Sequence, residues 1–436
     1  MTSPLMQRVA QEHAACAAQL PASVVSAERR RQALDELVAS GLPATHDEHW
    51  RYANLRSLER TTFTPAARAA QNAGALAELP LPVPGWARLV IADGMLQHST
   101  HRAHLPPGVT VSSARVSVAA GAGAAAARPT APGPVDDRFA LLNEAFATDA
   151  VEIEARAAGN GIASLELMFV SGGRAAVYPR LRVTVEPGGR LRLFERHLGG
   201  GELALTNGRV EVHVGRDAVL EHFRVQAQTA ESTWIETLDA SVGERAVYAL
   251  HQYELGARSA RSTTRITLAG PQAAVQLYAA SVAEGSQVQD SYARIDHAAP
   301  RTRTVENFRG IASGRARVAF SGHIVVRRGS PGADSKQSLR GLLAGPEAEV
   351  DARPQLEIYT DDVKCSHGAT AGKLDESMLF YLLSRGIDRD TARSLLKWAF
   401  LEDTVAHIAD AALRSIIEEL LAARLRDATV TAGRKP

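Results

Sequence analysis

The stretch "RLRVTVEPGGRLRLFERH", residues 180–197, decides the fold of this chain. Apolar and polar residues alternate on both sides of a Pro-Gly-Gly turn, a pattern typical of a strand, a tight turn and a second strand. The same pattern recurs in "RVEVHVGRDAVLEHFRV", "TLDASVGERAVYALHQYEL" and "RITLAGPQAAVQLYAAS", which begin at Arg209, Thr237 and Arg265. A strand–turn–strand unit is therefore repeated along the middle of the chain.

The repeats are regularly spaced. The frame "LAGPQAAV" at Leu268 returns as "LAGPEAEV" at Leu343, a separation that we interpret as three equal steps of the repeat. Between these two frames, "RVAFSGHIVV" at residues 317–326 supplies another unit, with a turn expected at Gly322. One glycine marks the turn in each of the first four units, at nearly equal intervals: Gly188, Gly215, Gly243 and Gly270.

A repeat of about 20–50 residues is typical of a solenoid, in which each unit buries its apolar face against its neighbours. When the units consist of short strands, parallel stacking gives a parallel β-helix. The alternative is a large antiparallel sandwich, whose strands recur roughly every 8–12 residues without a longer period. The regular spacing favours the solenoid, so we predict a mainly β fold with a parallel β-helix core at residues 135–372.

Helical patterns flank the repeats. Near the N-terminus, "SAERRRQALDELVASG" offers Ser26 as an N-cap and Gly41 as a stop signal. Residues 118–134 are almost entirely Ala, Gly and Pro, a composition typical of a linker. Beyond the repeats the helical period returns. We therefore expect an N-terminal helical region at residues 1–134 that ends in this linker, and a C-terminal helical domain with a short tail at residues 373–436.

Composition argues against several classes of protein. The net charge of +1, from 49 basic and 48 acidic residues, disfavours a nucleic-acid-binding protein. The two cysteines, Cys16 and Cys365, are too few for a disulfide framework. The sequence shows no signal peptide and no apolar run long enough to span a bilayer, so we expect no membrane partner and a cytoplasmic protein. The segment "GATAGKL" at Gly368 imitates a phosphate-binding loop with the wrong spacing, so we expect no ATP binding by this chain alone.

The stretch "DDVKCSHGAT", residues 361–370, places a thiol and an imidazole two positions apart. On a strand, Cys365 and His367 would share one face, with attachment points about 6.6 Å apart. Two ligands are half of a tetrahedral set, so a closed structural zinc site is disfavoured. A shared or transient metal site completed by other residues remains open, and so does an ordinary packed pair. A Cys/His nucleophilic pair is disfavoured because no orienting third group is evident.

Several stretches resemble the SufB/SufD family of iron–sulfur cluster assembly proteins. "PQLEIYTDDVKCSHGATAGKLDESMLFYLLSRGI", residues 354–387, is similar to the C-terminal signature of that family. "GLPATHDEHWRYANL", residues 41–55, resembles an N-terminal motif of the SufD branch, and "FALLNEAF" at residues 139–146 and "RVAFSGHIVV" also look familial. The similarity covers most of the chain.

The resemblance implies a right-handed parallel β-helix flanked by helical domains. It also implies a SufB-like paralogue as the partner in a heterodimer, a SufC-like ABC ATPase that docks on the C-terminal helices, and sulfur supply by a cysteine desulfurase system. His367 matches the family histidine at the subunit interface where a cluster is thought to form, and Cys365 matches the neighbouring cysteine. The ATPase-docking segment, residues 374–425, would present these apolar side chains: Leu382, Leu395, Leu396, Trp398 and Phe400.

One departure from the family pattern locates the chain within it. SufB-like chains carry a cysteine on the strand before the Pro354-Gln355 pair, whereas this chain has "GPEAEVDARPQ" there, with carboxylates and no thiol. The primary sulfur acceptor is therefore expected on the paralogue. We expect a scaffold subunit without catalytic residues or an intrinsic cofactor, and a transient iron–sulfur cluster or iron at the interface. The alternatives are a β-helix enzyme acting on a polysaccharide and a purely structural stabiliser of the complex.

Overall fold

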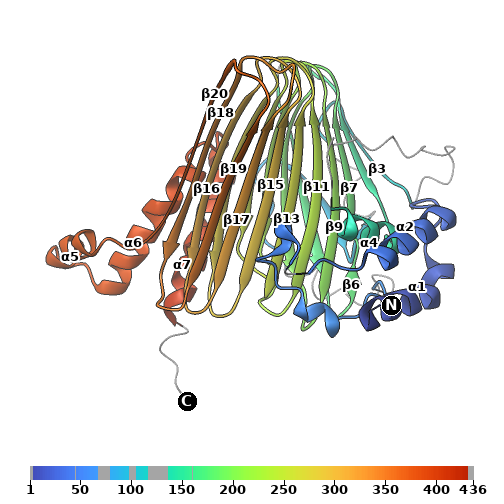
Figure 1. Ribbon diagram of the computed structural model, residues 1–436, viewed down its shortest axis with the longest axis horizontal. Helices are drawn as coiled ribbons and strands as arrows, with labels where there is room; N and C mark the ends of the chain where they lie inside the picture. The colour runs from blue at the N-terminus through green and yellow to red at the C-terminus, as the bar shows by residue number, and fades with distance from the viewer. Residues whose placement is uncertain are drawn as a thin grey trace.

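A computed structural model describes residues 3–44, 46–66, 79–97, 105–115, 136–159 and 161–430, with side chains described through residue 425. Figure 1 shows a stack of long strands with the N-terminal helices at one end and the C-terminal helices at the other. The strands form two sheets, and neighbouring strands along the stack pair in parallel. From β7 onward, successive strands alternate between the two sheets. The middle of the molecule is therefore a parallel β-helix, as the repeat predicts.

Two sheets of ten strands each make up the described part of the stack. In spatial order the first sheet contains β2 (Met95–Leu96), β1 (Ala87–Ala92), β5 (Ala163–Ser171), β8 (Arg190–Gly199), β10 (Val219–Gln226), β12 (Val247–Glu254), β14 (Ala274–Ala283), β16 (Arg303–Ala312), β18 (Ala333–Leu343) and β20 (Val363–Lys373). The second contains β19 (Glu349–Ile358), β17 (Arg317–Val326), β15 (Val288–His297), β13 (Ser259–Leu268), β11 (Thr233–Val242), β9 (Leu205–Val214), β7 (Arg180–Val185), β4 (Val151–Ala155) and β3 (Val109–Ser113), and β6 (Ala176–Val177) pairs with β9.

One turn of the β-helix contains a strand from each sheet, and register partners give its length. Val247 pairs with Ala274, Ala274 pairs with Arg303, and Arg303 pairs with Asp334. Each of these steps along the chain is slightly longer than the one before it. The length of a turn therefore varies slightly along the β-helix.

The interpretation of the separation between Leu268 and Leu343 as three equal steps is wrong. Leu268 ends β13 in the second sheet, whereas Leu343 ends β18 in the first. Strands β13 and β17 are two turns apart, and β18 follows half a turn later. The two similar segments thus cross between the sheets in opposite directions, and they look alike because both are strand–turn–strand corners.

The four turn glycines occupy one corner of the β-helix. Gly188 follows β7, Gly215 follows β9, Gly243 follows β11 and Gly270 follows β13, and all four strands lead from the second sheet into the first. A methyl group at Gly215 would lie 2.8 Å from the backbone nitrogen of Pro187 in the preceding turn. Glycine is needed at this position because the corners stack backbone against backbone.

The turn expected at Gly322 is wrong. Arg317–Val326 forms one continuous strand, β17, with Gly322 in its middle. A methyl group there would overlap Gln337 and Glu306, which face it across the interior. Glycine at this position makes room for two polar side chains and does not reverse the chain.

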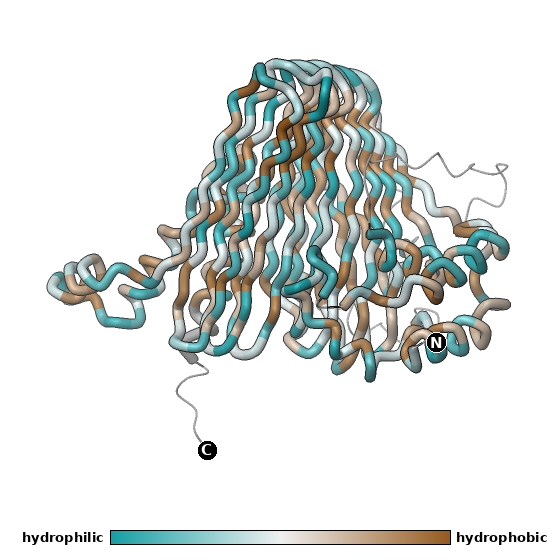
Figure 2. The backbone as a smooth tube through the Cα atoms, in the orientation of Figure 1, coloured by the Kyte–Doolittle hydropathy of each residue, from teal (hydrophilic) through white to brown (hydrophobic). Residues whose placement is uncertain are grey.

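Both apolar and polar side chains point into the interior of the β-helix. On β8 the inward residues are, in order, Leu191, Leu193, Glu195 and His197, and all four are buried. Figure 2 shows hydrophobic and hydrophilic residues alternating along the strands of the stack. Burial of the apolar part drives folding, while the buried charged groups need partners inside the β-helix.

The N-terminal segment folds against the outer face of the second sheet. Ser26 caps α2 by accepting the Arg29 backbone N–H at 3.2 Å, and Gly41 ends the helix, as predicted. Its apolar residues pack with Phe139, Phe146 and others into one cluster that includes Ile235 of β11. The described helices of this segment are α1 (Pro4–Cys16), α2 (Ala27–Ser40) and α4 (Arg138–Phe146), with short turns η1 (Ala17–Gln19), η2 (Glu48–Trp50) and η3 (Arg56–Glu59).

The region at residues 1–134 is not helical throughout, contrary to expectation. Strand β1 pairs in parallel with β5, and β3 pairs antiparallel with β4, so both extend the sheets at the N-terminal end of the stack. They form strands because alternating apolar residues such as Leu89 and Ile91 cover the core there. The expected linker at residues 118–134 lies outside the described residues, and so does the tail after residue 430.

Three helices follow the last strand: α5 (Glu376–Ser384), α6 (Arg389–Leu401) and α7 (Ala411–Val430), with η6 (Glu402–Thr404) between the last two. Asp375 caps α5 by accepting the backbone N–H groups of Ser377 and Met378. Apolar residues of the segment from α6 to α7 pack in one cluster with Phe223 and Tyr253 of the first sheet. Figure 1 shows α5 projecting away from the strands.

Candidate functional site

The last turn of the β-helix, β19 and β20, is an open end. These strands pair with β17 and β18 and are the terminal members of their sheets. Leu339 of β18 is buried, whereas its register partner Ala369 of β20 is exposed. A solenoid end that leaves its inner face in water needs a cap or a partner. The open end is therefore the first place to look for a binding surface.

Cys365 and His367 lie on β20 at this open end. Cys365 is level with buried Ser335, and His367 is level with buried Gln337. The register puts both side chains on the face of β20 that continues the interior, as strand periodicity predicts. Cys365 is half-buried and His367 is exposed. Both residues are thus accessible at the rim rather than sealed in the core.

The environment of Cys365 keeps its thiol neutral. Partial burial raises the pKa of the Cys365 thiol, and the nearby Asp334 carboxylate raises it further. Because the thiolate is the form that attacks and binds metal, this thiol is not an activated nucleophile. A metal ion would have to displace the thiol proton before Cys365 could bind it. Cys365 is therefore suited to bind a metal only when the other ligands are already in place.

A three-ligand cluster lies elsewhere in the described part of the chain. Glu195, His197 and Glu236 approach one another within 4.8 Å inside the β-helix. Arg224 pairs with both carboxylates, and His222 Nε2 lies 2.8 Å from a Glu195 oxygen. Although burial alone would raise the pKa of Glu195, Arg224 and His222 hold it well below its usual range. The guanidinium occupies the place a cation would take, so we interpret this cluster as a structural ion-pair network.

The five apolar residues expected to receive an ATPase do not share one exposed face. Leu395 is 46% exposed, while Leu382 and Leu396 are half-buried. Trp398 and Phe400 pack against the cluster that joins the C-terminal helices to the first sheet. Their side chains are used in part to hold α6 in place.

Sequence reasoning missed the most exposed large apolar side chains among the described residues of the C-terminal helices. On α5, Met378 is 57%, Phe380 71% and Tyr381 57% exposed. The signal was present in "ESMLFYLLS", where apolar residues lie on all sides of a short helix. A helix packed on one neighbour uses only one apolar face, so the others are available to a partner.

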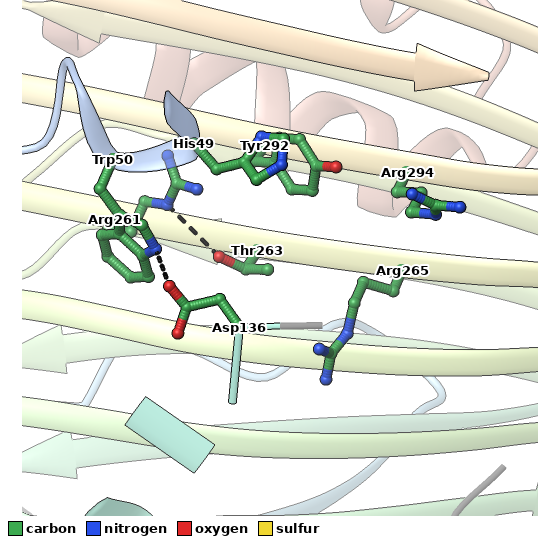
Figure 3. Close-up of a pocket in the computed structure, with 8 residues that line it drawn as sticks. All are labelled: His49, Trp50, Asp136, Arg261, Thr263, Arg265, Tyr292 and Arg294. Carbon is green, nitrogen blue, oxygen red and sulfur yellow. Dashed lines mark hydrogen bonds between the residues drawn. The ribbon is translucent and has the colours of Figure 1, made fainter. Parts of the chain in front are cut away.

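A small pocket lies where the N-terminal segment meets the second sheet. Trp50 donates a hydrogen bond to Asp136 at 2.5 Å. Figure 3 shows this hydrogen bond and Arg261 beside the indole. The guanidinium of Arg261 lies 4.5 Å from the Trp50 ring centroid and pairs with Asp290. The cavity is about 30 Å³, room for a single water. We interpret it as the joint that anchors the N-terminal segment, because its charges are already paired and its volume admits no substrate.

No helix in the described ranges combines the length and hydropathy that crossing a membrane requires.

Comparisons with known proteins agree on one family. The family model for the SUF system FeS cluster assembly SufBD core domain matches residues 168–400, more than half of the chain. The chain is 27% identical over 404 residues to the iron–sulfur cluster assembly protein SufD of Escherichia coli, covering 91% of this chain and 92% of that protein. It is 27% identical over 412 residues to the SufBD family protein slr0076 of Synechocystis, with 91% and 90% covered. The chain therefore belongs to the SufBD family of iron–sulfur cluster assembly proteins of the SUF system, and its similarity lies with the SufD branch.

Proposed function

We propose that this chain is a scaffold subunit of an iron–sulfur cluster assembly complex. In this complex it pairs with a SufB-like paralogue through the open end of its β-helix and binds a SufC-like ABC ATPase through its C-terminal helices. A cysteine desulfurase system supplies sulfur to the complex. The chain itself is not an enzyme and holds no resident cofactor; the cluster is the cargo of the assembly.

The single observation that carries the proposal is the open end. Strand β20 leaves exposed the face that β18 buries, as the pair Leu339 and Ala369 shows. A related β-helix can continue the stack there by placing its own last turn against β19 and β20, which satisfies the free strand edges. Family relatives of the same fold are the natural partners for such a contact.

The half-set of ligands supports the pairing. Cys365 and His367 sit on the exposed face that a partner would cover. A thiol and an imidazole are suitable ligands for iron and for cluster intermediates. Since two ligands are an incomplete set, the remaining ligands would come from the paralogue, which also supplies the primary sulfur acceptor. Neutral Cys365 would lose its proton only when metal arrives.

The projecting helix α5 supports the ATPase contact. Its exposed side chains Met378, Phe380 and Tyr381 form an apolar surface on a short helix that stands off the body of the protein. Exposed aromatic and Met side chains are typical of interface cores. ATP-driven dimerisation of two ATPase subunits would pull on α5 and α6 and change the contact between the two β-helices. This change would let the cluster enter and leave the interface between them.

The proposal is tested with the purified three-component complex. We expect His367→Ala to lower the iron and acid-labile sulfide bound after reconstitution, while the complex still forms. The matched control is His213→Ala, since His213 is an exposed histidine on β9, several turns away from the open end. Undiminished cluster yield in His367→Ala would remove the histidine from the mechanism. Normal assembly by the double variant Cys365→Ala, His367→Ala would reduce this chain to a structural stabiliser.

A further inference from the structure

Three polar side chains stand in line at the open end. Glu306 of β16 is the register partner of Gln337 of β18, and Gln337 is the register partner of His367 of β20. Neighbouring strands lie about 4.8 Å apart, and register partners project from the same face. Glu306 and Gln337 are buried, whereas His367 is exposed at the rim. The row therefore runs from the interior of the β-helix to the candidate ligand.

The hydrogen bond within this row has a fixed direction. Gln337 donates its Nε2 hydrogen to Glu306 Oε2 at 3.0 Å. An ionised carboxylate only accepts hydrogen bonds, so in its ionised state Glu306 selects the amide nitrogen and turns the amide oxygen away from itself. Gln337 Oε1 is buried and has no hydrogen-bond partner among the described residues. A buried carbonyl oxygen without a donor is costly, so this atom is suited to receive one.

The opposite sheet is shaped around the same pair. Gly322 of β17 faces Glu306 and Gln337, and any side chain there would overlap both. The inward residues of β17 that precede it, Val318 and Phe320, are apolar members of the core. Glycine at position 322 thus leaves space in the core for the Glu306 carboxylate and the Gln337 amide. Burial raises the pKa of Glu306 to about 7, which only hydrogen bonding to Gln337 opposes.

We propose that Glu306 and Gln337 form a carboxylate–amide relay that positions His367. In this relay Gln337 Oε1 accepts the imidazole N–H that faces it, and the other ring nitrogen presents its lone pair at the open end to the metal of the cargo. Both residues are positioning residues, because they act through His367. The inference rests on the proposed function for its purpose, but the hydrogen bond that it asserts requires no other subunit.

The chemical reason is that an imidazole ligand must be neutral and in one tautomer. Histidine ligands commonly donate their second N–H to a carboxylate or carbonyl, and loss of that partner weakens metal binding by about 10- to 100-fold. Gln337 supplies a carbonyl oxygen, and Glu306 fixes which end of the amide points outward. Without Glu306 the amide can turn over and offer its NH₂ group, which would compete for the lone pair that the metal needs.

The first test measures the tautomer of His367 in the isolated full-length chain. Imidazole nitrogen shifts of ¹⁵N-histidine protein report which ring nitrogen carries the proton, and His367→Gln assigns the signal. We expect one dominant tautomer in the wild type and a mixture in Gln337→Met, which keeps the side-chain length and removes the acceptor. Glu306→Gln, which keeps the shape and removes the charge, should give an intermediate mixture. An unchanged tautomer in both variants would overturn the relay.

The second test measures bound iron and sulfide in the reconstituted complex. We expect Gln337→Met to retain about a tenth or less of the wild-type cluster. The matched control is Glu254→Gln, because Glu254 is also a carboxylate buried inside the β-helix but is held by Ser281, Ser291 and Gln252, away from β20. The Glu254→Gln complex should bind as much iron and sulfide as the wild-type complex. Circular dichroism and the melting temperature of each variant identify any that fails to fold.

The two tests separate the relay from the proposed function. If the wild-type complex binds no cluster, the proposed function fails, and the tautomer of His367 in the isolated chain still decides the relay. Suppose that the wild-type complex binds a cluster and the His367→Ala complex does not. If Gln337→Met then keeps both the His367 tautomer and the wild-type amount of cluster, the relay fails and the proposed function stands.

Discussion

Glu306 and Gly322 belong to one local arrangement although they lie on opposite sheets. The absent side chain at Gly322 leaves the space in which Glu306 and Gln337 meet. A carboxylate buried without a cation is unfavourable when ionised, because the protein interior solvates charge poorly. This one arrangement therefore affects both the packing and the pH dependence of stability, and each effect can be measured separately.

The packing around Gly322 predicts how much stability is lost when a side chain fills the space beside it. Gly322→Ala should lower the free energy of unfolding by about 1–3 kcal/mol, because the new methyl group displaces two buried side chains. The control is Gly372→Ala on β20, where no heavy atom lies within 4 Å of the added methyl group; its effect should stay within about 0.5 kcal/mol. Urea unfolding measures both. Equal free energies of unfolding for Gly322→Ala and Gly372→Ala would contradict the contacts assigned to Gly322.

The ionisation effect predicts how stability depends on pH. Burial raises the folded-state pKa of Glu306 to about 7, above the value of about 4.3 in an unfolded chain. The folded state therefore holds the proton more tightly, and stability falls as pH rises through this window and levels off above it. Between pH 5 and pH 8 the wild type should lose up to about 3 kcal/mol relative to Glu306→Gln. Parallel pH slopes for the two proteins in urea unfolding would show that Glu306 titrates normally.

At the scale of elements, local pattern predicts strands and caps but not which sheet a strand joins. Alternation and glycine turns identified the strands around residues 180–281, and Ser26 was readable as a cap because capping is local. The similar sequences at Leu268 and Leu343 suggested that three equal repeat steps separate them. That interpretation is wrong because similar strand–turn–strand corners occur on both sides of the β-helix. Strand β1 was missed because it lies outside the repeat and pairs with β5.

Leu379 is the one residue of helix α5 that is buried, so the N-cap of this helix should have a local effect. Asp375→Ala removes the acceptor for two backbone N–H groups and should cost the helix about 1 kcal/mol. Because α5 projects from the body and packs on α6, faster amide hydrogen exchange in residues 376–384 should appear without a fall in the global melting temperature.

A matched cap elsewhere provides the comparison. Ser26→Ala removes a similar N-cap from α2, which packs into the N-terminal cluster through Ala33 and Leu37. This variant should lower the global melting temperature, since α2 contributes to a shared core. If Asp375→Ala lowered the melting temperature as much and left exchange in α5 unchanged, α5 would be part of the cooperative unit and not an independent docking element.

At the scale of the whole molecule, the proposed function depends on where the stack of strands stops. The sequence predicted that Cys365 and His367 share one face of a strand, since residue types and their spacing are visible in one strand, and the register confirms that placement. It did not reveal the row behind His367, because Glu306, Gln337 and His367 are far apart along the chain and meet only through the register. Exposure at the open end is likewise set by where the described turns stop, which no local pattern encodes.

The two surfaces of the molecule should therefore be separable by mutation. Ala369→Lys adds a charge to the exposed inner face of β20 and should abolish binding to the SufB-like paralogue, because the partner would have to bury that charge. Phe380→Ala removes an exposed ring from α5 and should weaken ATPase binding while leaving the paralogue bound. Each variant is the control for the other, since both positions are exposed and neither change should shift the melting temperature of the isolated chain. Pull-down with each partner measures the two affinities. Loss of both partners in either variant would mean that the open end and α5 form one surface, and the division of labour proposed for this chain would be wrong.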